Sequence, residues 1–420
     1  MDNQEYVEPV PEKRPGFGKG VAAGVLITLL LVSIMAGGIL LGVRAGNQRK
    51  AAKNSGEESS KKAVLEEKVE KKSGDIADLI DQYYYEEIDE NALVEGMYEG
   101  MVNGLGDPYS SYFTAEEYAS FNDTTTGIYY GIGAVLTQNI NTKIVTILHV
   151  YPGTPAEEAG VKDGDVVVKV GEIEGDSMEL SELVNHIKGE EGTKVHLELL
   201  RAGEEDHVEL DVERRKIEVP TVQYQMLEGD TAFIQVSEFS NSTPEQFSEA
   251  IKEMQAQGMK SMIVDLRDNP GGVLKSVCLM LDELLPEGLL VYTEDKYGER
   301  TEYRSDAECM EIPMAVLINE NSASASEIFA GAIKDYEYGT LIGTTTFGKG
   351  IVQTIIPMED GSAVKLTMAK YFTPKGNDIH GVGISPDIEL EYEYLEKDET
   401  YNPMHDNQVQ KALEILQKEE

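Results

Sequence analysis

The sequence is poor in cysteine and in basic residues. Only two of its 420 residues are cysteines, Cys278 and Cys309; these are too few for a disulfide framework and are expected to be core or loop thiols. Neither a C-x-x-C pair nor an H-E-x-x-H motif occurs, which removes the commonest redox and zinc sites. Lys and Arg number 36 against 77 Asp and Glu, a formal net charge of −41. Because Lys and Arg supply most nucleic-acid affinity by displacing counterions, this acidity argues against nucleic acid as a partner.

Apart from these shortages, the composition is that of a globular protein. The hydrophobic fraction of 41% is too high for general disorder. At about one domain per 150 residues, the length predicts two to three domains.

One uncharged run predicts a membrane span. Residues 20–43 carry no charge, and a helix needs about 20 apolar residues to cross the hydrocarbon core. A cleaved signal peptide has an apolar region of only about 7–15 residues before a small-residue cleavage site, so an uncleaved anchor is favoured. Residues 1–19 form a short tail, and residues 44–74 a charged linker or short helical stalk. Basic residues flank the span on both sides, so charge alone does not orient it.

The sequence predicts three further parts of the chain: a helical module, an α/β core and a C-terminal helix. Residues 75–117 have apolar residues at helical spacing and then a turn-rich passage, 104–113, for which the sequence suggests no role. Residues 205–400 alternate apolar strands with helical stretches, which predicts an α/β core with parallel crossovers, and residues 401–420 predict a C-terminal helix. Strands are expected at 232–236, 262–266, 315–318 and 340–343, and helices at 244–257, 273–285 and 325–336.

Residues 118–204 predict a compact α/β domain. A glycine turn leads into an apolar strand, and further strands, a capped helix at 155–160, a helix at 180–187 and a closing strand at 195–200 follow. This order resembles a PDZ domain, with Tyr130, Gly131, Ile132 and Gly133 in the place of its carboxylate-binding loop. Consecutive N–H groups of such a loop can hold a terminal carboxylate while the peptide adds as a strand. A glycine turn alone is more often a plain turn.

Two strand-to-helix turns in the core carry the candidate chemistry. Asn269-Pro-Gly-Gly272 exposes backbone N–H groups at a helix start, which suits an oxyanion hole, although alone it is typical of a plain turn. Asn321-Ser-Ala-Ser-Ala-Ser-Glu327 follows a strand and precedes an apolar helix. Its serines are either helix N-caps or include a nucleophile exposed on the turn.

A serine nucleophile needs a general base, and lysine suits this sequence better than histidine. Only His380 of the six histidines lies in the α/β core, and nothing around it suggests an orienting carboxylate, so a Ser-His-Asp triad is poorly supported. Lys349 stands among apolar and glycine neighbours, where burial would lower its pKa from about 10.4 toward 7–8. The stretch 343–350 also has P-loop spacing. However, Gly350 replaces the Ser or Thr that holds magnesium and a β-branched run follows, so nucleotide binding is disfavoured.

Taken in order, these motifs resemble the C-terminal processing peptidases, the tail-specific Ser-Lys proteases. The resemblance covers residues 75–420 and rests on GLGDPYSSYF, a PDZ domain, LRDNPGG, NSASASEIFAGA, GTTTFGKGIVQ, YFTPKG and HGVGISPDI. It implies an α/β and α+β multidomain protein, with a single N-terminal transmembrane helix and a PDZ domain before an α/β superhelical, crotonase-like protease core. Family members are extracytoplasmic, which implies a single-pass protein of the cell membrane with its catalytic part outside.

The resemblance implies Ser324 as nucleophile, Lys349 as general base and Gln353 as the residue that orients the lysine. Backbone N–H groups would form the oxyanion hole, those of Gly271, Gly272 and Ala325. Along a strand at about 3.3 Å per residue, Lys349 and Gln353 would lie about 13 Å apart, too far for a hydrogen bond. A helical turn over 348–353 would bring them within about 6 Å, and we predict that turn.

The implied function is that of a membrane-anchored extracytoplasmic serine endopeptidase, which recognises substrate C-terminal tails through its PDZ domain and cleaves through an acyl-enzyme. Its partners would be proteins or peptides with free C-terminal tails and, through one helix, the membrane. No cofactor or metal is needed, and a homo-oligomer is compatible with this function. The alternative is a non-catalytic PDZ scaffold on a degenerate protease core, against which the retained Ser324, Lys349 and Gln353 argue. An acyl-CoA enzyme of related architecture would explain neither a PDZ domain nor a membrane anchor.

Overall fold

The structure is a computed structural model that describes residues 67–204, 206–395 and 401–419. The predicted tail at 1–19 and the predicted span at 20–43 lie outside these residues, as does the first part of the predicted stalk. Within the described part of the chain, no helix has the length and apolar character needed to cross a membrane.

The chain divides into two compact units, Met1–Glu90 and Asn91–Glu420. The described part of the first unit holds a helix over 67–83, so the end of the predicted stalk is helical. Every candidate catalytic and peptide-binding residue lies in the second unit.

The second unit opens with a helical module that adds a strand to an antiparallel sheet formed by later parts of the chain. Its elements are α2 (Glu90–Asn103), β1 (Ser111–Phe113) and α3 (Ala115–Thr126). The turn-rich passage 104–113 ends in β1, which pairs antiparallel with β18 (Ala363–Phe372). The Asp107 carboxylate closes the turn by accepting hydrogen bonds from the Ser110 hydroxyl at 2.6 Å and the Tyr109 N–H at 3.1 Å. The Ser110 hydroxyl accepts from the Thr367 N–H at 3.1 Å, which fixes this passage on β18.

A PDZ-like domain follows, and it is longer than predicted. Its elements are β2 (Ile128–Gly131), β3 (Ala134–Gln138), β4 (Val145–Val150), α4 (Pro155–Ala159), β5 (Val166–Val170), β6 (Ile173–Glu174), α5 (Leu180–Ile187), β7 (Lys194–Leu200), β8 (Val208–Glu213) and β9 (Arg215–Glu218). Both predicted helices are confirmed. The boundary at residue 204 is wrong, because β8 pairs with β7 and Val212 is fully buried in this domain's core. The alternating apolar and acidic residues of 208–213 are typical of a half-buried strand.

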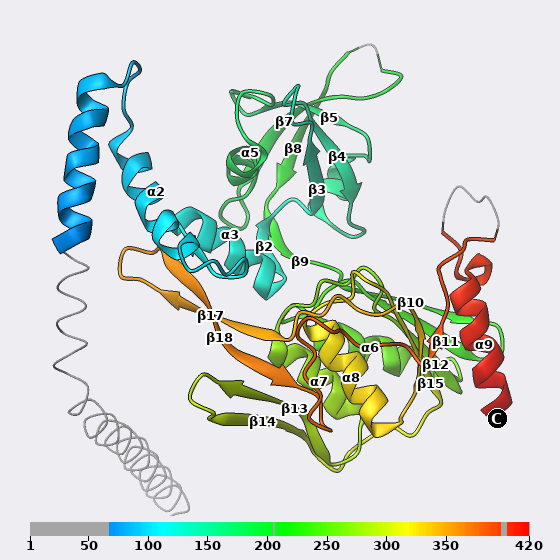
Figure 1. Cartoon of the computed structure of the whole chain (residues 1–420). Coiled ribbons are helices and arrows are strands. Elements are labelled where there is room, and N and C mark those ends of the chain that lie inside the picture. The colour runs from blue at the N-terminus through cyan, green and yellow to red at the C-terminus, as the bar shows by residue number, and fades with distance from the viewer. Residues whose placement is uncertain (1–66, 205, 396–400, 420) are drawn as a thin grey trace, which may run out of the picture. The chain divides into compact units, whose positions relative to one another are not determined.

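The α/β core is built on a six-stranded sheet (Figure 1). Its order is β10 (Val222–Leu227), β11 (Thr231–Val236), β12 (Ser261–Asp265), β15 (Met314–Ile318), β16 (Thr340–Gly343) and β19 (Ile388–Glu389). All pairs are parallel except β10 with β11. The connecting helices are α6 (Thr243–Ala256), α7 (Leu274–Leu284) and α8 (Ala325–Tyr336). The predicted strand–helix alternation is therefore confirmed.

Helices cover both faces of this sheet. Successive residues of β12 point to opposite faces, so Met262 and Val264 pack with α6, α7 and α8, whereas Ile263 packs with the C-terminal helix α9 (Asn407–Glu419). A short helix, η1 (Pro403–His405), precedes α9. Figure 1 shows α9 separated from α6, α7 and α8 by the strands of the sheet. The predicted C-terminal helix is thus part of the core.

A second sheet is antiparallel and carries the segment after the candidate base. Its order is β1, β18, β13 (Gly288–Asp295) and β14 (Arg300–Ser305), and β17 (Ile351–Pro357) pairs with β18. In the first sheet β12 and β15 are neighbours. The turns that follow them, 269–272 and 319–324, therefore meet at one edge, where the carboxyl ends of parallel strands usually form binding sites.

Candidate active site

The middle serine of the second turn is set apart from the other two. Ser322 and Ser326 are fully buried and donate hydrogen bonds to backbone carbonyls, of Leu266 at 2.7 Å and Asn269 at 2.9 Å. Ser324 is half-buried, lies directly before α8 and lines a cavity of about 470 Å³. Its backbone has φ 56° and ψ −112°, a conformation that a non-glycine residue rarely adopts and that is often found at active sites. The two outer serines are therefore structural, and Ser324 alone faces the cavity.

The cavity at Ser324 brings together every residue predicted for catalysis. Lys349 and Gln353 line it, and the oxyanion candidates do so as well: Gly271, Gly272 and Ala325. These residues come from the ends of β12, β15 and β16 and from the start of β17, so the two sheets build the cavity jointly.

Lys349 is a half-buried lysine held beside aromatic and cationic neighbours. Burial lowers its pKa below the ordinary 10.5, and the positive charge of Lys365 lowers it further, while Glu327 and Asp107 oppose the shift. Its Nζ lies 5.1 Å from the centre of the Tyr109 ring. Among the described residues, no hydrogen bond joins Lys349 Nζ to the Ser324 hydroxyl. The lysine side chain is long and flexible, and hydrogen bonds between catalytic groups often form only when substrate is bound.

The predicted helical turn over 348–353 is wrong. Residues 348–350 have no regular structure, and Gln353 lies in the extended strand β17, opposite Thr367 of β18. The Gln353 amide donates to the Ile351 carbonyl at 3.5 Å. No hydrogen bond between Lys349 and Gln353 occurs in the described part of the chain. Gln353 lines the cavity, but it does not orient the lysine directly in this structure.

One predicted oxyanion donor is already in use. The Gly271 N–H donates to the Asn269 side-chain oxygen at 2.8 Å, so it is not available to a substrate. Ala325 begins α8, where an N–H has no partner within the helix. In the described hydrogen bonds the Gly272 N–H also has no acceptor. The remaining candidate donors for an oxyanion hole are therefore the N–H groups of Gly272 and Ala325.

Sequence reasoning missed Glu327, a buried carboxylate that joins the two catalytic segments. Its oxygens accept from the N–H groups of Ser324 at 2.8 Å, Gly348 at 2.7 Å and Lys349 at 2.8 Å, and from the Thr346 hydroxyl at 2.7 Å. The sequence signal was available, because a Ser followed three residues later by Glu is a capping box. The N–H groups that a P-loop would offer to a phosphate are therefore occupied by a carboxylate.

Tyr371 is a second residue that the sequence did not reveal. Its hydroxyl donates to the carbonyl of Ser324 at 3.0 Å and also to the carbonyl of Lys349. The ring is almost completely buried, and burial raises the pKa of this phenol, which keeps it a neutral donor. Glu327 and Tyr371 thus both bind the backbones of Ser324 and Lys349: Glu327 accepts from their N–H groups, and Tyr371 donates to their carbonyls.

The PDZ-like domain has a groove where the peptide site was predicted. A cavity of about 270 Å³ is lined by Gly131 and Ile132 from the predicted loop and by Val184 and Ile187 of α5. The side chain of Tyr130 is 46% exposed and is not among the lining residues. Tyr129 lines the groove instead, and burial raises its pKa to about 12. Of the four predicted loop residues, Gly131 and Ile132 line the groove and Tyr130 and Gly133 do not, and the tyrosine that faces the groove is the one before Tyr130.

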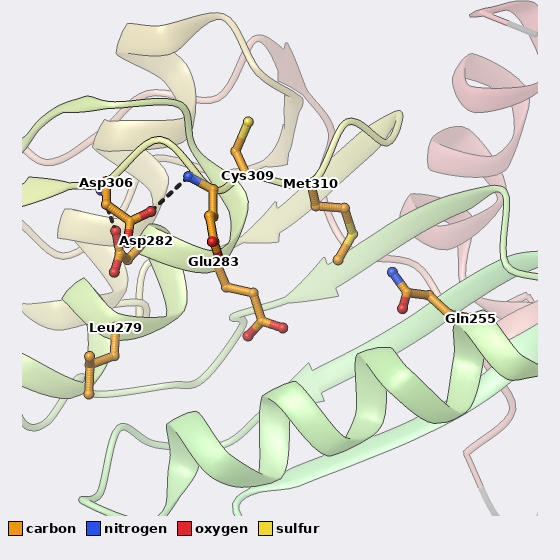
Figure 2. A pocket seen from close by; sticks show the side chains of 8 residues that line it. Gln255, Leu279, Asp282, Glu283, Asp306, Cys309 and Met310 are labelled. Atoms are coloured by element: carbon orange, nitrogen blue, oxygen red, sulfur yellow. Dashed lines mark hydrogen bonds between the residues drawn. The ribbon is translucent and has the colours of Figure 1, made fainter.

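The remaining candidates do not form a competing catalytic site. His380 is exposed and does not line the cavity of Ser324. A separate acidic cavity of about 400 Å³ contains none of the predicted site residues. Its lining includes Asp282, Glu283 and the exposed Cys309 (Figure 2). In the described residues, no cluster of side chains could hold a metal ion. Cys278 and Cys309 are both free thiols, as predicted.

Comparison with known proteins identifies the family of this chain. Peptidase family S41 matches residues 230–390, a PDZ domain matches 146–201, and the N-terminal domain of the activating protease CtpB matches 32–117. The carboxy-terminal processing protease CtpA of Bacillus subtilis strain 168 is 39% identical over 328 residues, which cover 76% of this chain and 69% of the relative. The chain belongs to the C-terminal processing peptidases of family S41. It is accordingly a serine-type peptidase with a PDZ domain.

Other members of this peptidase family are similar over a comparable part of the chain. A probable CtpA-like serine protease of Staphylococcus aureus strain COL is 38% identical over 318 residues. This match covers 74% of the chain and 63% of the relative, so the chain spans slightly less than two thirds of that protein. A putative S41 protease from Bacteroides fragilis NCTC 9343 has the same fold, with a TM-score of 0.50 at 17% identity over 77% of this chain and 90% of that one. A photosystem II D1 C-terminal processing protease gives a TM-score of 0.46 at 30% identity, covering 76% and 88%.

Proposed function

We propose that this S41 peptidase is a membrane-anchored, extracytoplasmic endopeptidase that cleaves by a Ser324–Lys349 mechanism. One observation carries the proposal: a half-buried serine on a strained turn, a desolvated lysine and two unused backbone N–H groups line the same cavity. No described carboxylate forms an ion pair with the Lys349 ammonium, and burial favours its neutral form. A lysine has to be neutral to accept a proton, so a lowered pKa is what a lysine base needs at ordinary pH.

The chemistry follows from these positions. Lys349 Nζ accepts the proton of the Ser324 hydroxyl, and the serine oxygen attacks the carbonyl carbon of the scissile amide. The negative charge that develops on the carbonyl oxygen is stabilised by the N–H groups of Gly272 and Ala325, at the N-terminus of α8. Lys349 then gives its proton to the leaving amine. Water attacks the resulting ester and releases Ser324.

The lysine side chain completes the site by rotation. Its ammonium stacks on Tyr109 at 5.1 Å, an arrangement that favours the protonated form. Deprotonation removes that attraction, because the ring attracts a cation and not a neutral amine. Loss of the proton and movement toward Ser324 are thus coupled.

Tail recognition and anchoring complete the proposal. The groove between β3 and α5 suits an extended peptide that adds beside β3, with its terminal carboxylate at the Gly131–Gly133 backbone. The uncharged stretch 20–43 supports a single membrane span, and the family resemblance supports an extracytoplasmic catalytic part. The substrates would be proteins with accessible, unfolded C-terminal tails.

A cleavage assay separates this function from a non-catalytic scaffold. The full chain and its Ser324→Ala and Lys349→Met variants are incubated with β-casein, an unfolded test protein, and fragments are identified by mass spectrometry. Cleavage by the wild type and its loss in both variants support the proposal. Cleavage that persists in the Ser324→Ala variant overturns it, and a wild type that cleaves nothing favours the scaffold.

A further inference from the structure

A second lysine in the catalytic cavity takes no direct part in the steps above, although its positive charge helps to lower the pKa of Lys349. Lys365 lies on β18, opposite Ile355 of β17 and Ser111 of β1, and lines the same cavity as Ser324. It is partly buried, and burial lowers the pKa of its ammonium. The Lys365 ammonium is therefore partly desolvated and lies in the same cavity as Ser324.

Lys365 has no counter-ion among the described residues, although the protein is rich in acidic side chains. In the described part of the chain it takes part in no ion pair, although acidic residues outnumber basic ones by 77 to 36. Lys370 on the same strand pairs with Asp378 at 3.0 Å. Glu238 also lines the cavity but is paired with neither lysine there. A cation that is partly removed from water is stabilised by a counter-ion, so this position suits a carboxylate of a ligand in the cavity.

Two aromatic rings hold the Lys365 ammonium in position. Its Nζ lies 5.2 Å from the centre of the Phe113 ring and 5.8 Å from that of Phe121. Phe113 ends the turn-rich passage 104–113, and Phe121 lies on α3, so the helical module supplies both rings. The centroids of the two rings are 5.3 Å apart, so the rings pack against each other and restrict each other's movement. Such rings attract the cation without neutralising it, so its charge stays available to a ligand.

We propose that Lys365 is a specificity-determining residue that binds a carboxylate of the peptide substrate next to the scissile bond. The inference rests on the proposed peptidase function and adds the chemistry of its substrate. The carboxylate comes either from an acidic side chain at a fixed position beside the cleaved bond or from the substrate's own C-terminus. A charge-assisted hydrogen bond in a partly dry cavity discriminates such substrates from neutral ones by about tenfold.

Cleavage-site profiling tests the proposal and separates the two sources. The full chain digests a library of peptides of varied sequence and length, and the cut sites are identified by mass spectrometry. An acidic side chain as ligand predicts enrichment of Asp and Glu at one fixed position relative to the cut. A terminal carboxylate as ligand predicts cuts at a fixed distance from the peptide's C-terminus, lost when that terminus is amidated.

Variants of the lysine decide whether Lys365 is responsible. Lys365→Met keeps the length of the side chain and removes its charge; it should abolish the preference and raise KM about tenfold for the preferred peptides. The value of kcat should be much less affected when it is compared at a pH where Lys349 is neutral in both proteins, because the Lys365 charge also lowers the Lys349 pKa. Lys365→Arg should restore the preference, and Lys365→Glu should replace it with one for Lys and Arg. Lys370→Met removes a charge from the same strand outside the cavity and should change nothing.

The outcomes distinguish this inference from the proposed function. Ser324-dependent cleavage with the same cut sites in the wild type and the Lys365→Met variant overturns the inference and leaves the peptidase function intact. A wild type that cleaves no peptide overturns both.

Discussion

At the scale of single residues, the site depends on how the proposed nucleophile and base are held as much as on their own chemistry. Glu327 accepts four hydrogen bonds, from the N–H groups of both catalytic residues and from two neighbours. Tyr371 binds the carbonyls of the same two residues. Ser324 and Lys349 lie 25 positions apart in the sequence, and these two side chains fix their backbones to each other.

Glu327→Gln should damage both activity and stability. An amide has one acceptor oxygen in place of two, and its NH2 group would face N–H donors, leaving buried groups unpaired. Each buried hydrogen bond to a charged group contributes about 1.5–3 kcal/mol, so we expect unfolding to be easier by about 2 kcal/mol or more. We expect kcat/KM on casein to fall at least about 10²-fold because the serine and lysine lose their register. Glu337→Gln, at the exposed end of the same helix, is the control and should behave like the wild type.

Lys349→Met should abolish cleavage without lowering thermal stability. The folded protein disfavours the charged lysine, as the lowered pKa indicates, so below that pKa the ammonium destabilises the fold. As pH rises from the lowered pKa toward 10.5, the folded wild type loses the proton while the unfolded chain keeps it, so the wild type becomes more stable. The methionine variant has no such ionisation at this position. The variant's advantage in Tm should therefore be greater at pH 7 than at pH 10. A variant that melts well below the wild type at pH 7 would contradict this account of the lysine.

At the scale of elements, the turn after β12 positions one oxyanion donor. Gly272 has φ 141°, and a Cβ there would lie 2.3 Å from the Phe239 carbonyl oxygen. Gly272→Ala should therefore displace the turn and lower kcat by about 10²-fold or more, the usual effect of losing an oxyanion donor. Gly258→Ala is the control for backbone strain alone. Gly258 also has positive φ, at 95°, but a Cβ there would meet open space and displace nothing. Steady-state kinetics of the two variants on one peptide should show a large loss only for Gly272→Ala.

The regular elements of the core were predictable, whereas the segments between them were not. Buried strands and amphipathic helices have local patterns, and the predicted strands and helices of the core match the observed ones. The helical turn over 348–353 failed because 351–355 pair with β18, and β-branched residues there favour the strand. The use of the Gly271 N–H by Asn269 is a local side-chain turn that the Asn-Pro-Gly-Gly sequence could have indicated. The role of 104–113 could not be found locally, since its partner Thr367 lies 257 positions away.

At the scale of the whole molecule, one arginine joins the catalytic edge of the sheet to the C-terminal segment. Arg267 follows β12, and its guanidinium bonds Asp265 and Asp406, each at 2.7 Å, with the side chain only 9% exposed. Tyr401 donates to Asp406 at 2.8 Å, just before η1 and α9. The turn of the oxyanion hole and the last helix of the core are therefore parts of one polar network.

Arg267→Met should destabilise the entire α/β core. It leaves Asp265 and Asp406 buried without a counter-ion, and breaking a buried pair in this way costs about 3–5 kcal/mol. Arg304→Met removes an exposed pair with Glu302, at 3.0 Å, and should change stability by less than about 1 kcal/mol. Denaturant unfolding followed by the fluorescence of the core tyrosines measures both. Equal stability of the two variants would show that the network is unimportant for folding.

The central claim is that Ser324 is a nucleophile activated by a lysine with a lowered pKa. A fluorophosphonate probe, which reacts with activated serines and needs no knowledge of the substrate, tests it directly on the full chain. Mass spectrometry should find the label on Ser324, and the labelling rate should rise with pH through one ionisation below 10.5 as Lys349 loses its proton. The Lys349→Met chain should be labelled at least about 10²-fold more slowly and without that ionisation. Labelling of another serine, or equally fast labelling of Ser324 in the Lys349→Met chain, would contradict the account.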